Sequence, residues 1–156
     1  MELTSIQQSH ILQTLKTNFG KGIDLHSADM SYVWTLEDTL CLDVHCPYML
    51  NSHKCEPCWS LSALLKILPV KITGRYNYTD IEGVIDQFYF RLVKDVKDTD
   101  IIGEKVDPYE AYKIQYVAGS LIGYTTDYHI SCVDACVEMI EKIYKNLGED
   151  GIVNIS

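Results

Sequence analysis

The sequence lacks long apolar stretches. No apolar run in it approaches the roughly 20 residues that a membrane-spanning helix needs. The first five residues contain neither a basic region nor an apolar core, so we expect no secretory signal peptide. These absences predict a cytoplasmic protein that does not associate with membranes. In that compartment its six cysteines would be reduced thiols.

Basic residues are also scarce. Lysine and arginine total 13 against 22 aspartate and glutamate residues, which gives a formal net charge of −9 at pH 7. Proteins that bind nucleic acid broadly use clustered lysines and arginines to displace counterions from the phosphate backbone. We therefore expect no nucleic-acid partner. The charge is that of an ordinary acidic cytoplasmic protein and is compatible with a basic partner.

Known catalytic motifs are missing as well. The sequence contains no nucleophile elbow and no phosphate-binding loop, and Gly20-Lys21-Gly22 lacks the third glycine of a dinucleotide-binding fingerprint. With five histidines and six cysteines, pairs of a nucleophile and a base arise by chance. The sequence favours a non-enzymatic protein, although a site assembled from scattered residues would not be visible in it.

Helical periodicity is clear in three segments. Apolar residues recur every three or four positions over 4–19, 60–68 and 132–147. Ser60 is a suitable N-cap for the second segment, and Pro69 ends it because proline removes a backbone donor. The third segment has the cleanest apolar stripe of the chain. We therefore predict two amphipathic helices, at 60–68 and 132–147, and an additional N-terminal helix.

Strand-like alternation fills the interval between the two amphipathic helices. Apolar and polar residues alternate over 88–93 and 112–117, and Gly119-Ser120 offers a tight turn into 121–124. These patterns predict an α+β fold in which both amphipathic helices cover one face of an antiparallel sheet of three to four strands. The length of the chain predicts a single domain over 1–156.

Residues 41–58 show no clear period, and we interpret them as an irregular loop rich in cysteine and histidine. Cys55 and Cys58 have the spacing of one zinc knuckle, but a second knuckle is missing. Cys58 beside Trp59 equally suits a small buried residue. We predict reduced cysteines and no cofactor, with a structural zinc ion as the alternative. The candidate zinc ligands would be Cys41, His45, Cys46, His53, Cys55 and Cys58.

Tyrosine is unusually frequent, with 11 residues, most of them in the strand region. Its ring packs while its hydroxyl reaches water, so it suits both half-buried sheets and recognition surfaces. If the helices cover the sheet face that contains Tyr112 and Tyr116, other tyrosines of the 109–128 hairpin stay exposed. We expect Tyr109, Tyr124 and Tyr128 to be protein-binding candidates, with simple sheet packing as the alternative.

Three stretches carry a resemblance. Gln8-Ser9 leads to Ala28-Asp29-Met30 near the start, Pro57-Cys58-Trp59-Ser60-Leu61-Ser62-Ala63-Leu64-Leu65 lies in the middle, and Val133-Asp134-Ala135-Cys136-Val137-Glu138-Met139-Ile140 near the end. In these stretches the chain resembles short proteins encoded by phages, prophages and other mobile elements of Bacteroides and its relatives. The resemblance implies a mobile-element origin and a cytoplasmic location. It implies no activity, catalytic residue or ligand, and Cys41 to Cys55 departs from the shared pattern.

These observations support three hypotheses about function. The leading one is a small, non-enzymatic accessory protein of a phage or mobile element that binds a host or phage protein. The first alternative is a zinc-stabilised binding module built on 41–58. The second is an enzyme, or a protein that sequesters a small ligand, whose site is not visible in the sequence. A deep pocket lined by tyrosine, histidine and Arg75 or Arg91 would favour this last hypothesis. The oligomeric state stays open.

Overall fold

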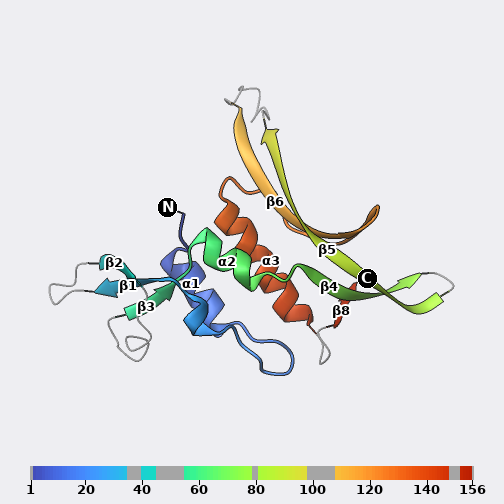
Figure 1. The fold of residues 1–156 in the computed structure, drawn as a ribbon, viewed down its shortest axis with the longest axis horizontal. Coiled ribbons are helices and arrows are strands. Elements are labelled where there is room, and N and C mark those ends of the chain that lie inside the picture. The colour runs from blue at the N-terminus through green and yellow to red at the C-terminus, as the bar shows by residue number, and fades with distance from the viewer. Residues whose placement is uncertain are drawn as a thin grey trace.

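The computed structural model describes residues 2–34, 40–44, 55–78, 81–97, 108–147 and 152–155, and within them three α-helices accompany two sheets (Figure 1). This arrangement confirms the predicted α+β fold and its N-terminal helix. The helices are α1 (Ile6–Thr14), α2 (Leu61–Ile67) and α3 (Cys132–Asn146), with a short 3-10 helix, η1 (Leu25–Ser27). The strands are β1 (Met30–Trp34), β2 (Leu40–Val44), β3 (Cys55–Cys58), β4 (Lys71–Tyr78), β5 (Ile81–Lys97), β6 (Tyr109–Ala118), β7 (Leu121–Thr125) and β8 (Ile152–Ile155).

The larger sheet has the strand order β7-β6-β5-β4-β8. Strands β4 to β7 are antiparallel, as predicted, and β8 adds a parallel edge strand beside β4. Side chains alternate between the two faces of each strand. On one face Ile72 lies opposite Phe88, and Phe90 lies opposite Tyr116. Ile72, Phe88 and Tyr116 are buried, so this face forms one wall of the core.

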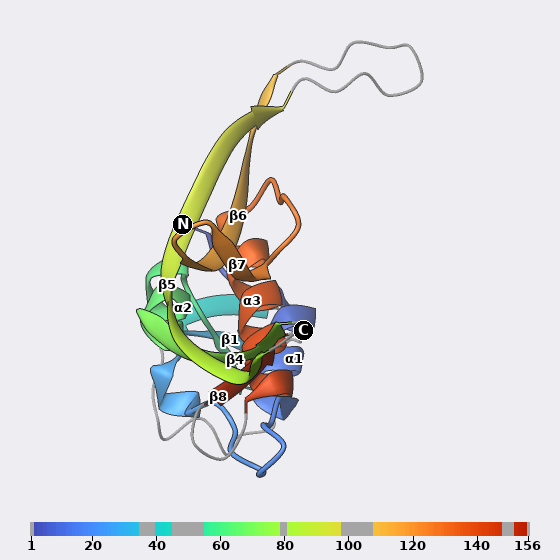
Figure 2. The same cartoon turned by 90° about the vertical axis from the view of Figure 1, so that its right-hand side faces the viewer.

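Helix α3 lies between the larger sheet and the other two helices (Figures 1 and 2). It contacts β6, β7 and β8, and it also contacts α1 and α2. Eight of its 15 residues are buried, more than a single apolar stripe would provide. Helix α2 lies on the same side of the sheet as α3, as predicted, but it packs on α3, and α3 is the helix that contacts the sheet strands directly.

Helix α2 begins and ends where its sequence predicts. The Ser60 hydroxyl oxygen accepts a hydrogen bond from the Ala63 amide at 3.3 Å, which satisfies one free donor of the first turn. At the other end, the Tyr116 hydroxyl donates to the Pro69 carbonyl at 2.6 Å. This bond attaches the segment after α2 to β6, an interior strand of the larger sheet.

The N-terminal helix is shorter than its sequence pattern predicts, because α1 ends at Thr14 instead of Phe19. A tight turn replaces the last helical turns: the Thr17 amide donates to the Lys21 carbonyl at 2.9 Å. The Lys21 amide donates to the Thr17 hydroxyl at 3.1 Å. Gly20 takes a φ of +81° here, a conformation that glycine adopts without strain. Phe19 is consequently on the surface, not in the core.

The stretch 41–58, predicted to be an irregular loop, begins and ends as strand. Its two ends belong to β2 and β3, which flank β1 in the smaller sheet, while 45–54 lie outside the described residues. Pro57 sits within β3, opposite Ser31 of β1. Because β3 is an edge strand, the missing N–H of proline can face away from the ladder. Pro57 therefore marks a strand edge and not a break.

The Trp59-Ser60 step joins the smaller sheet to α2. Trp59 is fully buried, and its indole N–H donates to the Ser27 hydroxyl at 2.9 Å. The Trp59 amide donates to the Thr4 hydroxyl at 3.0 Å, and the Thr4 amide donates to the Trp59 carbonyl at 2.9 Å. The Ser60 amide donates to the Asp29 carboxylate at 2.9 Å. These bonds hold the N-terminal segment, η1 and the smaller sheet against the helical layer.

The core position of α2 can be tested with two neighbouring leucines. Leu64 is fully buried, whereas Leu65 is 37% exposed. Leu64→Ala leaves a cavity, so we expect it to lower the free energy of unfolding by about 2–5 kcal/mol. Leu65→Ala is the matched control, with an expected loss of about 1 kcal/mol or less. Urea unfolding measures both. Equal losses would contradict the packing of α2 described above.

Candidate functional site

The larger sheet has one face that no helix of the described residues covers (Figure 1). Its side chains alternate along β4 to β7 with those that face the core. We call this surface the outer face. Its residues include Lys71, Tyr89, Arg91, Val93, Lys97, Lys113, Val117 and Ile122. Strands β5 and β6 also extend beyond α3, so part of this surface projects from the body of the molecule (Figure 2).

One row of the outer face crosses four strands. Lys71 lies opposite Tyr89, Tyr89 opposite Val117, and Val117 opposite Ile122. Directly opposite residues share a face, so these four side chains form a continuous band. Tyr89 is 51% exposed and Ile122 is 47% exposed. The band therefore presents aromatic and aliphatic surface to solvent beside a lysine.

The neighbouring row is polar and internally bonded. The Arg91 guanidinium donates through Nε to the Gln115 side-chain oxygen at 3.1 Å, and Nη2 also donates to this oxygen. Gln115 in turn donates through Nε2 to the Thr125 hydroxyl at 3.1 Å. Gln115 is buried between Arg91 and Thr125, to which it is hydrogen-bonded. The row fixes the Arg91 side chain across three strands.

A third group surrounds the Tyr128 ring. The Lys97 ammonium lies 3.9 Å from the ring centroid and the Lys113 ammonium 4.5 Å from it, both within cation–π range. Lys97 also pairs with Asp95 at 3.2 Å. The hydrogen bond from Lys97 holds the pKa of the Asp95 carboxyl below its ordinary value, so this carboxylate stays ionised at neutral pH. Tyr109 lies opposite Lys97 and borders the same group.

The three tyrosines predicted to bind a partner do not share one surface. Tyr109 and Tyr128 lie on the outer face, both beside Lys97. Tyr124 lies opposite Tyr116 on the core face, where it packs against the core. Burial raises the pKa of Tyr124 to about 12. A register shift between Tyr116 and Val117 moves Tyr124 to that side, because a one-residue offset exchanges the faces of a strand.

The outer face contrasts in charge with the whole chain. Its described side chains include four cations, Lys71, Arg91, Lys97 and Lys113, and one carboxylate, Asp95. The chain as a whole has a net charge of −9. The sequence could have indicated this surface, since Tyr89 and Arg91 alternate with Phe88 and Phe90, but the cross-strand register was needed to assemble it. The result is a locally basic surface on an acidic protein.

The candidate zinc ligands are only partly within the described residues. His45, Cys46 and His53 lie outside them, and Cys41 belongs to β2. Val33 lies opposite Cys41 on one side and Cys55 on the other, so two strand spacings, about 10 Å, separate those two backbones. Among the described side chains, no three of His, Cys, Asp or Glu group as metal ligands.

Cys58 belongs to the core. Its thiol donates to the Thr4 carbonyl at 3.5 Å and accepts from the Thr4 hydroxyl at 3.7 Å. Burial raises the pKa of the Cys58 thiol above its ordinary value, despite lowering contributions from hydrogen bonds to Thr4 and Tyr32. Zinc binds the thiolate form, which burial disfavours here. The environment of Cys58 therefore fits a packed thiol better than a metal ligand.

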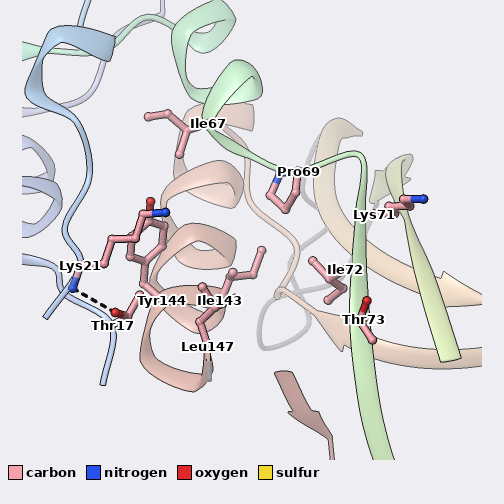
Figure 3. A pocket seen from close by; sticks show the side chains of 10 residues that line it. All are labelled: Thr17, Lys21, Ile67, Pro69, Lys71, Ile72, Thr73, Ile143, Tyr144 and Leu147. Carbon is pink, nitrogen blue, oxygen red and sulfur yellow. Dashed lines mark hydrogen bonds between the residues drawn. The ribbon is translucent and has the colours of Figure 1, made fainter. Parts of the chain in front are cut away.

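A separate cavity of about 330 Å³ lies between the Thr17–Lys21 turn, the end of α2, the start of β4 and the last turns of α3 (Figure 3). Its described lining contains no histidine or arginine, unlike the pocket anticipated for a small-ligand protein. Apolar side chains supply most of the wall, with polar groups from the turn, from β4 and from α3. The lining residues are Thr17, Lys21, Ile67, Pro69, Lys71, Ile72, Thr73, Ile143, Tyr144 and Leu147.

Comparison with protein-family models, with curated proteins and with solved structures finds no match for this chain. No helix among the described residues is both long enough and apolar enough to cross a membrane.

The zinc alternative predicts a measurable metal content. We expect protein purified without added metal to contain no stoichiometric zinc, because the Cys58 thiol is buried, neutral and bonded to Thr4. Elemental analysis of the purified protein measures this, and the melting temperature should be unchanged by a chelator. About one equivalent of zinc, together with loss of the fold on chelation, would show instead that the cysteine-rich stretch binds metal.

Proposed function

We propose that this protein is a non-enzymatic accessory protein that binds another protein through the outer face, and that the partner presents an acidic surface there. The observation that carries the proposal is the band Lys71, Tyr89, Val117 and Ile122, with Arg91 in the next row and Lys113 in the row after that. It combines exposed apolar area with cations on a sheet face that no described helix covers.

The residue types of the outer face suit a protein interface. Tyrosine and arginine are over-represented among residues that dominate binding energy. The hydrogen bonds from Arg91 to Gln115 hold the arginine in place, so less side-chain entropy is lost on binding. Tyr89 and Ile122 supply exposed area that a partner would bury. The four cations would attract an acidic partner and set its orientation.

A protein partner fits these features better than a nucleic acid does. Nucleic-acid affinity depends mainly on cations that contact phosphates, and the rest of this chain would repel a phosphate backbone. On the outer face, the cations lie beside the apolar side chains of Tyr89, Val117 and Ile122, so the surface is not a continuous basic patch. Much of the remaining surface is apolar. The resemblance to mobile-element proteins supports a host or phage protein as the partner and a cytoplasmic location.

Matched substitutions test the proposal once a partner has been captured from a Bacteroides host and purified. Tyr89→Ala should weaken binding about tenfold, or about 1.4 kcal/mol, with little change in melting temperature. Phe19→Ala is the control, because Phe19 is 60% exposed but lies in the turn after α1. Lys113→Glu should weaken binding and reduce its salt dependence. Its control is Lys66→Glu, on the exposed surface of α2.

Two results would contradict the proposal. One is equal affinity for the outer-face variants and their controls, which would place the contact elsewhere. The other is loss of the captured material on nuclease treatment, which would identify a nucleic acid as the partner. Isothermal titration calorimetry on the purified components measures the affinities of the variants and controls. Capture with and without nuclease shows whether the partner is a nucleic acid.

A further inference from the structure

The cavity near Thr17 is a second candidate site, separate from the outer face. Its apolar wall is formed by Ile67, Pro69, Ile72, Ile143 and Leu147 (Figure 3). Ile72 and Ile143 belong to the hydrophobic core, so the cavity opens from the core to the surface. Its volume of about 330 Å³ lies at the lower end of the range for small-molecule sites, roughly 300–1,000 Å³.

The turn that borders the cavity is fixed by hydrogen bonds. The Thr17 amide donates to the Lys21 carbonyl, and the Lys21 amide donates to the Thr17 hydroxyl. The Gly20 amide donates to the Thr17 carbonyl at 2.9 Å. Lys16 and Gly22 also form a bridge. Lys21 therefore leaves the backbone from a defined position at the cavity and not from a loose loop.

Two polar groups at the cavity have no partner in the described part of the chain. No described carboxylate pairs with the Lys21 ammonium. No described group hydrogen-bonds to the Tyr144 hydroxyl. Burial raises the pKa of Tyr144, so its hydroxyl stays protonated and can donate at neutral pH. Lys71 contributes to the lining as well, but its side chain extends away from the cavity (Figure 3).

We propose that this cavity binds a small organic anion with a compact apolar body. The apolar body would contact Ile72, Ile143 and Leu147, and the anionic group would meet Lys21 and the Tyr144 hydroxyl. Charge complementarity selects the anion: although the chain has a net charge of −9, the charged group that faces the cavity is the Lys21 ammonium, and the described lining contains no carboxylate. A carboxylate on an aromatic or branched aliphatic body has this chemistry.

A pair of probes that differ only in charge tests the proposal. The anion is 4-phenylbutyrate and its neutral counterpart is 4-phenylbutanamide. With methyl-labelled protein, we expect 4-phenylbutyrate to shift the NMR signals of Ile67, Ile72, Ile143 and Leu147 in a saturable way. The amide should bind several-fold more weakly at the same site, because it lacks the charge that Lys21 attracts.

Variants then separate the contributions of charge and volume. Lys21→Met removes the charge and should weaken 4-phenylbutyrate about 3- to 5-fold, the upper end of the effect of a solvent-exposed ion pair, while leaving the amide unchanged. Lys66→Met is the control, since Lys66 adjoins Ile67 but does not line the cavity. Ile67→Trp fills the cavity from its edge and should abolish binding of both probes. The melting temperature of each variant verifies that it is folded.

The outcomes are distinct from those for the outer face. Tyr89→Ala should leave 4-phenylbutyrate binding unchanged, so failure of one proposal does not imply failure of the other. Absence of saturable methyl shifts at millimolar 4-phenylbutyrate would overturn the cavity proposal. Equal affinity for the acid and the amide, or an unchanged affinity in Lys21→Met, would overturn its preference for an anion.

Discussion

The burial of α3 on two sides is the constraint on which the rest of the structure depends. Eight of its 15 residues are buried. The helix buries them by packing on the sheet on one side and on α1 and α2 on the other. Both other helices must then lie on the same side of the sheet as α3. The bonds of Trp59 with Ser27 and Thr4 hold the smaller sheet to that helical layer. No helix of the described residues covers the opposite side of the larger sheet.

This one-sided arrangement separates two kinds of surface. Toward the helices, the sheet presents Phe88, Ile114 and Tyr116 to the hydrophobic core. Away from them, it presents cations and half-exposed apolar side chains, although the chain as a whole is acidic. A locally basic surface on an acidic protein attracts an acidic partner to that surface and repels it from the rest of the molecule. The cavity near Lys21 likewise has a local positive charge in a chain whose net charge is negative.

Much of the fold could be predicted from the sequence, because in long periodic segments the spacing of the apolar residues indicates both the type of element and its buried face. Helix α3 and strands β5 and β6 show this, and their faces follow from alternation alone. The smaller sheet could not be predicted, since its strands are short and Pro57 resembles a break until β3 is known to be an edge. For the site, Tyr109 and Tyr128 lie on the uncovered face, and their contact with a partner stays a prediction. Tyr124 does not lie on it, because β7 has an extra residue at Gly123, between the partners of Val117 and Tyr116. Alternation alone does not show this shift, although a glycine inside a strand is a known sign of a bulge.

Hydroxyl-radical footprinting of the complex with its purified protein partner tests most directly whether the uncovered sheet face is the binding surface. It reports the solvent access of individual side chains on both sides of the molecule in one experiment. We expect oxidation of Tyr89 and Ile122 to slow on binding, while oxidation of Phe19, in the turn after α1, stays unchanged. Unchanged oxidation of Tyr89 and Ile122, with protection of Phe19 instead, would contradict binding at this face.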